Sequence, residues 1–115
     1  MKQDHSNWNN WAPNADVYVT DGVLVVKVEL AGLHPDELEV SIDGSKLVIS
    51  GQRADGSRTS PCKFHASEIR YGAFQCSVDV PKGYDIIRST AMYRNGFLRI
   101  DVPAVVESSD GGGAA

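Results

Sequence analysis

The chain has 115 residues, of which 42% are hydrophobic and 23% charged, so we expect one soluble globular domain with its own hydrophobic core. The net charge is −4 and the 11 basic residues are scattered along the chain, which argues against nucleic acid and anionic membranes as partners. No apolar run approaches the ~20 residues that span a bilayer and the N-terminus lacks a hydrophobic signal segment, so we expect a cytoplasmic protein.

The first segment, residues 1–15, is polar and rich in Asn, and it carries Trp8 and Trp11. A helix of this length is marginal in water, so we predict a short flexible arm. Two roles remain open for the tryptophans. They cap the end of the domain core, which is the interpretation that we favour, or they grip partner proteins.

Alternating apolar and polar residues predict paired β-strands in the first half of the domain, which we place at residues 16–104. The dipeptide Asp21-Gly22 supplies the turn of one hairpin, and Gly44-Ser45 supplies the turn of another. Gly32 and Pro35 break the pattern between the two pairs. The predicted strands of this half are 16–20, 23–30, 38–43 and 46–52.

A long segment without periodicity, residues 53–66, separates the two halves and contains Gly56 and Pro61. A loop of this length inside a compact domain is usually functional or carries structure of its own. It also holds one of the two cysteines, Cys62.

The second half contains another strand, which ends at Pro81, and then a hairpin at 89–102 around Asn95 and Gly96. Asn followed by Gly adopts the positive φ angles of a tight turn at little steric cost. After this turn, apolar and polar residues alternate until Pro103 ends the strand. The Gly-rich segment at residues 105–115 is predicted to be a disordered tail.

Seven or eight short strands with no helical period predict an all-β fold, a two-sheet antiparallel sandwich with an immunoglobulin-like outline. The inward-facing residues should include Leu24, Val26, Val28, Leu38, Val40, Leu47, Ile49, Phe74, Val78, Leu98 and Ile100.

The residues that carry enzyme chemistry form no convincing site. His5, His34 and His65 do not recur at metal-ligand spacing, and no ATP site is visible, so we predict no metal and no cofactor. Cys62 and His65 are three residues apart but lack an orienting group, so an ordinary loop cysteine is favoured over a nucleophile. Cys76 alternates in phase with apolar residues and is predicted to be a reduced, buried thiol.

Several short motifs resemble the small heat-shock protein family, whose common unit is the α-crystallin domain. The hairpin carries an Ala-x-x-x-(x)-Gly-x-Leu signature, and the segments before it carry Leu-x-Ile-x-Gly-(Glu/Gln)-Arg at 47–53 and Glu-x-x-Tyr-Gly-x-Phe at 68–74. The resemblance covers residues 16–103 in order. The motif residues on which it rests are Tyr71, Gly72, Phe74, Ala91, Gly96 and Leu98.

The resemblance implies two binding surfaces. In the family's bacterial and plant members the long loop carries a short extra strand that joins the sheet of a partner subunit, so we expect a homodimer formed by strand exchange. The loop residues assigned to this contact are Arg53, Arg58, Cys62 and Phe64. A groove between strands 38–43 and 89–94 would receive apolar segments, and its expected lining is Leu38, Val40, Ile42, Ala91 and Met92, although each of these also suits the core.

The function that the resemblance implies is ATP-independent holding of partly unfolded client proteins, with Trp8, Trp11 and the groove as contacts. An interaction module of the kind found in Hsp90 co-chaperones and a thiol-dependent enzyme using Cys62 are the alternatives. The family's large assemblies use an Ile-x-Ile motif in the tail, which does not occur here after Pro103, and the arm is short. We therefore expect a dimer or small oligomer.

Overall fold

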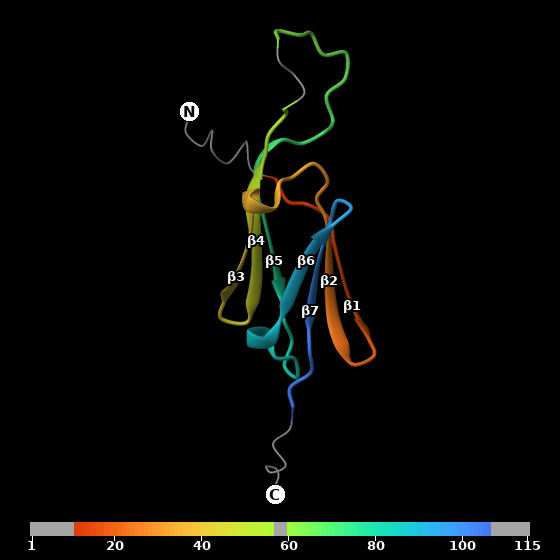
Figure 1. Cartoon of the computed structure of the whole chain (residues 1–115), viewed down its shortest axis with the longest axis vertical. Helices are drawn as coiled ribbons and strands as arrows, with labels where there is room; N and C mark the ends of the chain where they lie inside the picture. Colours follow the sequence, from red (N-terminus) through yellow and green to blue (C-terminus); the bar gives the residue numbers. More distant parts are fainter. Residues whose placement is uncertain (1–10, 57–59, 107–115) are drawn as a thin grey trace, which may run out of the picture.

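The structure is a computed structural model of the chain, and it describes residues 11–56 and 60–106. It is an all-β sandwich of two antiparallel sheets, as predicted (Figure 1). One sheet has the strand order β1-β2-β7-β6 and the other β3-β4-β5. The elements are β1 (Ala15–Thr20), β2 (Val23–Glu29), η1 (Pro35–Glu37), β3 (Leu38–Asp43), β4 (Lys46–Arg53), β5 (Gly72–Asp79), η2 (Ile86–Arg88), β6 (Thr90–Arg94) and β7 (Phe97–Val102).

The two predicted Gly-containing hairpin turns of the four-stranded sheet have the positive φ angles that were expected. Asp21 and Gly22 have φ angles of 52° and 76°, and Asn95 and Gly96 have φ angles of 55° and 81°. Two consecutive positive φ angles match the right-handed twist of the flanking strands. These turns therefore fix the register of β1 with β2 and of β6 with β7.

The pairing of β2 with β7 brings together segments that are far apart in the sequence. Val26 lies opposite Ile100, and Val28 lies opposite Leu98. Because side chains alternate across a strand, all four residues point to the same face of the sheet. This face packs against the second sheet and forms the centre of the core.

The core is closed where the two sheets overlap. Most of the predicted inward residues are buried, but Leu38, Val40 and Val78 are only half-buried because β3 and β5 are the outer strands of their sheet. Val25, on the opposite face of β2, is also fully buried between its cross-strand neighbours Tyr18 and Asp101. The buried apolar residues are Leu24, Val25, Val26, Val28, Leu30, Leu47, Ile49, Phe74, Val80, Leu98, Ile100 and Val102.

One glycine is required by close packing rather than by a turn. A Cβ atom at Gly51 would lie 2.6 Å from Cζ of Phe74 and would also collide with the carbonyl oxygen of Glu37. The Phe74 ring, 2% exposed, occupies the space that a side chain at position 51 would need. This contact explains the glycine in the 47–53 motif.

The long loop extends beyond one end of the sandwich (Figure 1). The expected short extra strand is not formed in the described part of this loop, 54–56 and 60–71. A short segment forms a strand only by pairing with a neighbouring strand, and none of the described strands pairs with this loop.

The chain after β7 remains bonded to the sandwich. Ala104 forms a bridge with Tyr84, and the amide of Val105 donates to the carbonyl oxygen of Gly83 at 2.9 Å. The predicted tail at 105–115 therefore begins with a residue that is still bonded to the domain, and 107–115 lie outside the described residues. Within the described ranges, no helix is long and apolar enough to cross a membrane.

Candidate functional site

The outer strands of the two sheets are the most exposed part of the sandwich. β1 and β6 flank one sheet, and β3 and β5 flank the other. The free side of an outer strand presents backbone N–H and C=O groups that can pair with another polypeptide. The molecule therefore offers several places for strand addition.

β1 combines an open edge with exposed apolar side chains. Val17 and Val19 are 46% and 53% exposed, although they lie opposite Val26 and Leu24 on the core-facing side of the sheet. The four-stranded sheet is wider than its three-stranded partner, so the outermost strand is left uncovered. This apolar strip is suited to a contact with another chain.

The edges β3 and β6 meet the core from the two sheets. Leu38 and Val40 of β3 and Tyr93 of β6 pack against the core cluster and are half-buried. Ile42 and Ala91 are exposed, and the strand registers place them on the core-facing side of their sheets, opposite Leu47 and Ile100. Four of the five expected groove residues, Leu38, Val40, Ile42 and Ala91, thus lie on the core-facing side of their sheets.

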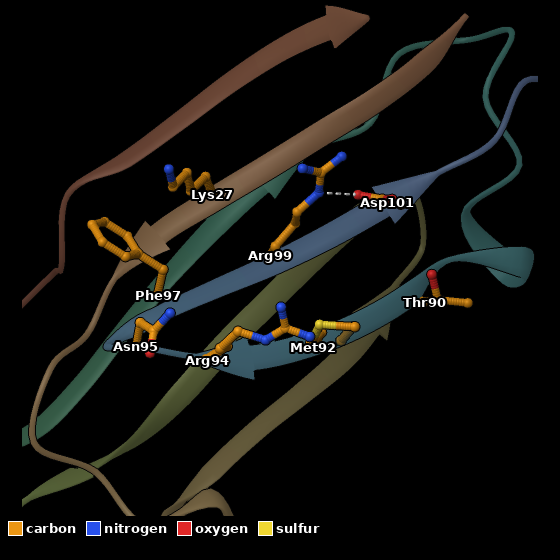
Figure 2. A pocket seen from close by; sticks show the side chains of 9 residues that line it. Lys27, Thr90, Met92, Arg94, Asn95, Phe97, Arg99 and Asp101 are labelled. Atoms are coloured by element: carbon orange, nitrogen blue, oxygen red, sulfur yellow. Dashed lines mark hydrogen bonds and ion pairs between the residues drawn. The ribbon is translucent and has the colours of Figure 1, made fainter. Parts of the chain in front are cut away.

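Met92 is the exception and corrects the prediction. It lies opposite Arg99, next to Ala91 in the strand, so alternation directs the two neighbours to opposite faces. Met92 is 55% exposed on the outer face of the sheet (Figure 2). It cannot line a groove between the sheets together with Ala91.

Trp11 covers part of the open edge of β5. Its amide donates to the carbonyl oxygen of Ala73 at 3.1 Å, and its carbonyl oxygen accepts from the amide of Gln75 at 3.0 Å, which forms a parallel bridge to Phe74. The indole packs on Phe74 with a centroid distance of 5.3 Å, and its Nε1 donates to the carbonyl oxygen of Gly72. Trp11 therefore caps the core, as the favoured interpretation stated, whereas Trp8 lies outside the described residues.

Arg53 fixes the base of the long loop. Its Nε and Nη2 donate to the carbonyl oxygen of Arg70 at 2.9 and 2.6 Å, and its Nη1 donates to that of Ala31 at 3.2 Å. The guanidinium lies over the Trp11 ring, 4.3 Å from its centroid. Arg53 thus joins the arm, the loop and the end of β2 rather than projecting with the loop, and Arg58 lies outside the described residues.

The loop itself displays apolar side chains. Phe64 and Ile69 are 55% and 67% exposed, and Cys62 is also exposed. Sequence reasoning did not select Ile69, because a single apolar residue in an aperiodic segment carries no pattern. The described part of the loop is therefore apolar enough to pack on another surface.

The residues of the family motifs have structural roles. Gly72, with φ 99°, begins β5 after the partly exposed Tyr71, and Phe74 and Leu98 are buried. Gly96 accepts a hydrogen bond from the amide of Leu30 at 2.8 Å, and a Cβ there would lie 3.2 Å from that of Ala31. These contacts connect the β6–β7 turn to the end of β2.

Enzyme-like chemistry has little support in the described residues. They contain no group of three His, Cys, Asp or Glu side chains that could hold a metal ion. Burial raises the pKa of the Cys76 thiol, which keeps it in the neutral form. The open edges can pair their backbone groups with another polypeptide.

Comparisons with known proteins agree with this geometry. The sequence profile of the Hsp20/alpha crystallin family matches residues 16–112. Small heat shock protein C2 of Rickettsia felis is 32% identical over 98 residues, which are 85% of this chain and 64% of that protein. The chain therefore spans less than two thirds of the length of that relative.

Solved structures show the same fold. Heat shock protein 16.0 from Schizosaccharomyces pombe superposes with a TM-score of 0.71 at 30% identity, covering 83% of this chain and 88% of that one. The hspA protein from Xanthomonas axonopodis gives a TM-score of 0.73 at 32% identity, covering 91% of this chain and 98% of that one. The chain belongs to the Hsp20/α-crystallin family of small heat-shock proteins.

Proposed function

We propose that this protein is an ATP-independent holding chaperone that captures partly unfolded proteins at its open strand edges and slows their aggregation. The observation that carries the proposal is the rim formed by β3 and β6. Its apolar residues pack only partly into the core, and among the described residues no further strand pairs with the outer side of either strand.

Capture by strand addition suits unfolded clients. Backbone groups of an extended segment pair with the edge whatever the sequence, and apolar side chains of the client bury the exposed part of Ile42 and Ala91. A native protein has already paired its backbone and buried its apolar residues. It therefore binds to the open edges more weakly than an unfolded protein does. Binding the unfolded form lowers its free concentration by mass action and needs no nucleotide.

The chain is also proposed to form a homodimer by strand exchange. The loop, with exposed Phe64 and Ile69, would lie along β1 of a second copy, and Val17 and Val19 supply an apolar strip on the core-facing side of that edge. An added strand would then satisfy the open backbone of β1. The Val17→Lys variant should lower the mass in solution to that of a monomer, whereas Thr20→Lys, on the other face of β1, should not.

The holding function is tested by light scattering of a heated model client with and without the protein. The wild-type protein should suppress scattering without ATP. Ala91→Gln should reduce this suppression, because the larger polar side chain occupies the rim, whereas Thr90→Gln on the outer face of the same strand should preserve it. Thermal unfolding of each variant checks that it remains folded.

Equal scattering with and without the wild-type protein would contradict the proposal. Suppression that Ala91→Gln and Thr90→Gln leave equally intact would contradict the role of the rim. Capture of one folded partner in place of unfolded clients would favour the interaction-module alternative.

A further inference from the structure

The outer face of the four-stranded sheet carries a shallow hollow beside the open edge of β6. Its volume is about 540 Å³, and Figure 2 shows its side chains rising from β2, β6 and β7. Three of them are cationic and two are large and apolar. We call these five residues the cationic patch: Lys27, Met92, Arg94, Phe97 and Arg99.

The positive charge of the patch is concentrated towards β6. Asp101 is the only carboxylate that the described part of the chain contributes to the hollow, and it accepts a hydrogen bond from Nε of Arg99 at 2.8 Å. Within the described residues, no ion pair forms at Arg94 or Lys27. The available cation nearest to the open edge is therefore Arg94.

Lys27 is less available. Its Nζ lies 4.5 Å from the centroid of the Phe97 ring, and on its other side Asp16 and Glu29 line a smaller hollow. The hollow therefore brings two carboxylates to the neighbourhood of Lys27. The patch therefore offers one cation on β6, Arg94, and a second cation, Arg99, that is shared with Asp101, together with the exposed apolar side chains of Met92 and Phe97.

The geometry of strand addition determines what this patch would meet. Side chains alternate between the two faces of a sheet, so a segment added beside β6 would direct every second residue towards the core-facing side, where Ala91 and Tyr93 lie. The intervening residues would lie on the outer face beside Met92 and Arg94. Directly opposed and diagonal neighbours on one face interact, and unlike charges in these positions attract.

We propose that the segments captured at the β6 edge alternate apolar and acidic residues, with the apolar residues directed to the core-facing side and the acidic residues directed to the outer face beside Arg94. This inference rests on the proposed capture of polypeptide at this edge and adds the chemistry of the captured segment. The net charge of −4 would on its own disfavour the binding of acidic segments. A preference for them therefore requires a local concentration of positive charge, which the patch supplies.

The test uses two short fluorescent peptides with the same alternating Val and Ile residues, one with Glu and one with Lys at the intervening positions. Fluorescence anisotropy measures the Kd of each peptide for the full chain at low and high salt. We expect the Glu peptide to bind about three- to tenfold more tightly at low salt, and we expect the difference to shrink at high salt.

Arg94→Glu should abolish or reverse this preference. Lys82→Glu makes the same change in net charge at an exposed turn outside the patch and should retain it. Equal binding of both peptides to the wild-type protein would overturn the acidic preference while leaving capture intact. An equal loss of preference in the two variants would overturn it as well, because net charge would then be the cause.

Two further results separate this inference from the proposed function. Binding of neither peptide, together with no suppression of client aggregation, would overturn both. A change in the mass of the peptide-free protein on Arg94→Glu would show that a second copy occupies this face, which would overturn the inference alone.

Discussion

Val26 and Val17 lie opposite each other on neighbouring strands and face the same side of the sheet, yet Val26 is fully buried and Val17 is 46% exposed. The two side chains are chemically identical. They differ only in position, because Val26 lies under the second sheet and Val17 lies on the outermost strand.

This comparison separates the closed interior from the exposed outer strands. The same alternation of apolar and polar residues builds both, and the overlap of a four-stranded sheet with a three-stranded sheet decides which apolar residues of the core-facing side are buried. The interior supplies the stability of the fold, since burial of a Val or Leu side chain contributes about 1.5–3 kcal/mol. The outer strands contribute less to stability and remain available for other chains.

The largest loss of stability is expected at Gly51, where the packed interior leaves no space for a side chain. Gly51→Ala places a Cβ against the carbonyl oxygen of Glu37 and the ring of Phe74, neither of which can move away freely. We expect a loss of about 3 kcal/mol in the free energy of unfolding, measured by urea denaturation. Gly56→Ala, where nothing lies within 4 Å, is the control and should be nearly neutral. Similar stabilities for the two variants would contradict the close packing.

The paired valines test the comparison itself. Val26→Ala should lower the free energy of unfolding by about 2–3 kcal/mol, because it removes buried carbon atoms and leaves a cavity. Val17→Ala should cost less than about 1 kcal/mol, since half of the side chain is already in water. Equal losses in urea denaturation would show that β1 is covered in solution, for example by a second copy.

A smaller effect is expected at the junction of rim and interior. The hydroxyl of Tyr93 in β6 donates to the carbonyl oxygen of Leu30 at 2.5 Å and accepts from the amide of Leu33 at 3.4 Å. Tyr93→Phe leaves these groups without that partner and should cost about 1–2 kcal/mol in the free energy of unfolding. Tyr18→Phe, on the exposed face of β1, should change it by less than about 0.5 kcal/mol, and an equal cost would argue against the junction.

The smallest expected difference is in the chemical reactivity of the two cysteines. Cys62 is exposed in the loop, whereas Cys76 is half-buried and burial raises its pKa, so less of it is the reactive thiolate. Iodoacetamide at mildly alkaline pH should alkylate Cys62 about tenfold faster than Cys76, as followed by mass spectrometry. Faster modification of Cys76 would show that β5 opens readily.

Much of the fold could be predicted from the sequence because its signals are local. Alternation identified the strands, and Asp-Gly and Asn-Gly fixed two turns whose φ angles are positive, as expected. The burial of Val25 could not be predicted, because it depends on strands that pair from distant parts of the chain. The half-exposure of Leu38 and Val40 has the same origin, since only the sheet order shows that β3 is an outer strand.

The candidate site was predicted less well than the fold. Met92 was assigned to the groove beside Ala91, although strand alternation alone separates neighbouring residues, so this error was avoidable. The contact of Trp11 with β5 and the hydrogen bonds of Arg53 join residues that are at least 17 positions apart in the sequence, and no local pattern encodes them. The cationic patch likewise gathers Lys27 and Arg94 from distant strands.

Hydrogen exchange with and without a heat-unfolded client tests the central claim most directly, because it reports which backbone amides of the rim become paired. The amides of the central strands β4 and β7 should exchange slowly in both samples. On client binding, new protection should appear in Leu38–Asp43 and Thr90–Arg94, the strands β3 and β6. Unchanged exchange in both strands while the client is held in solution would contradict the account.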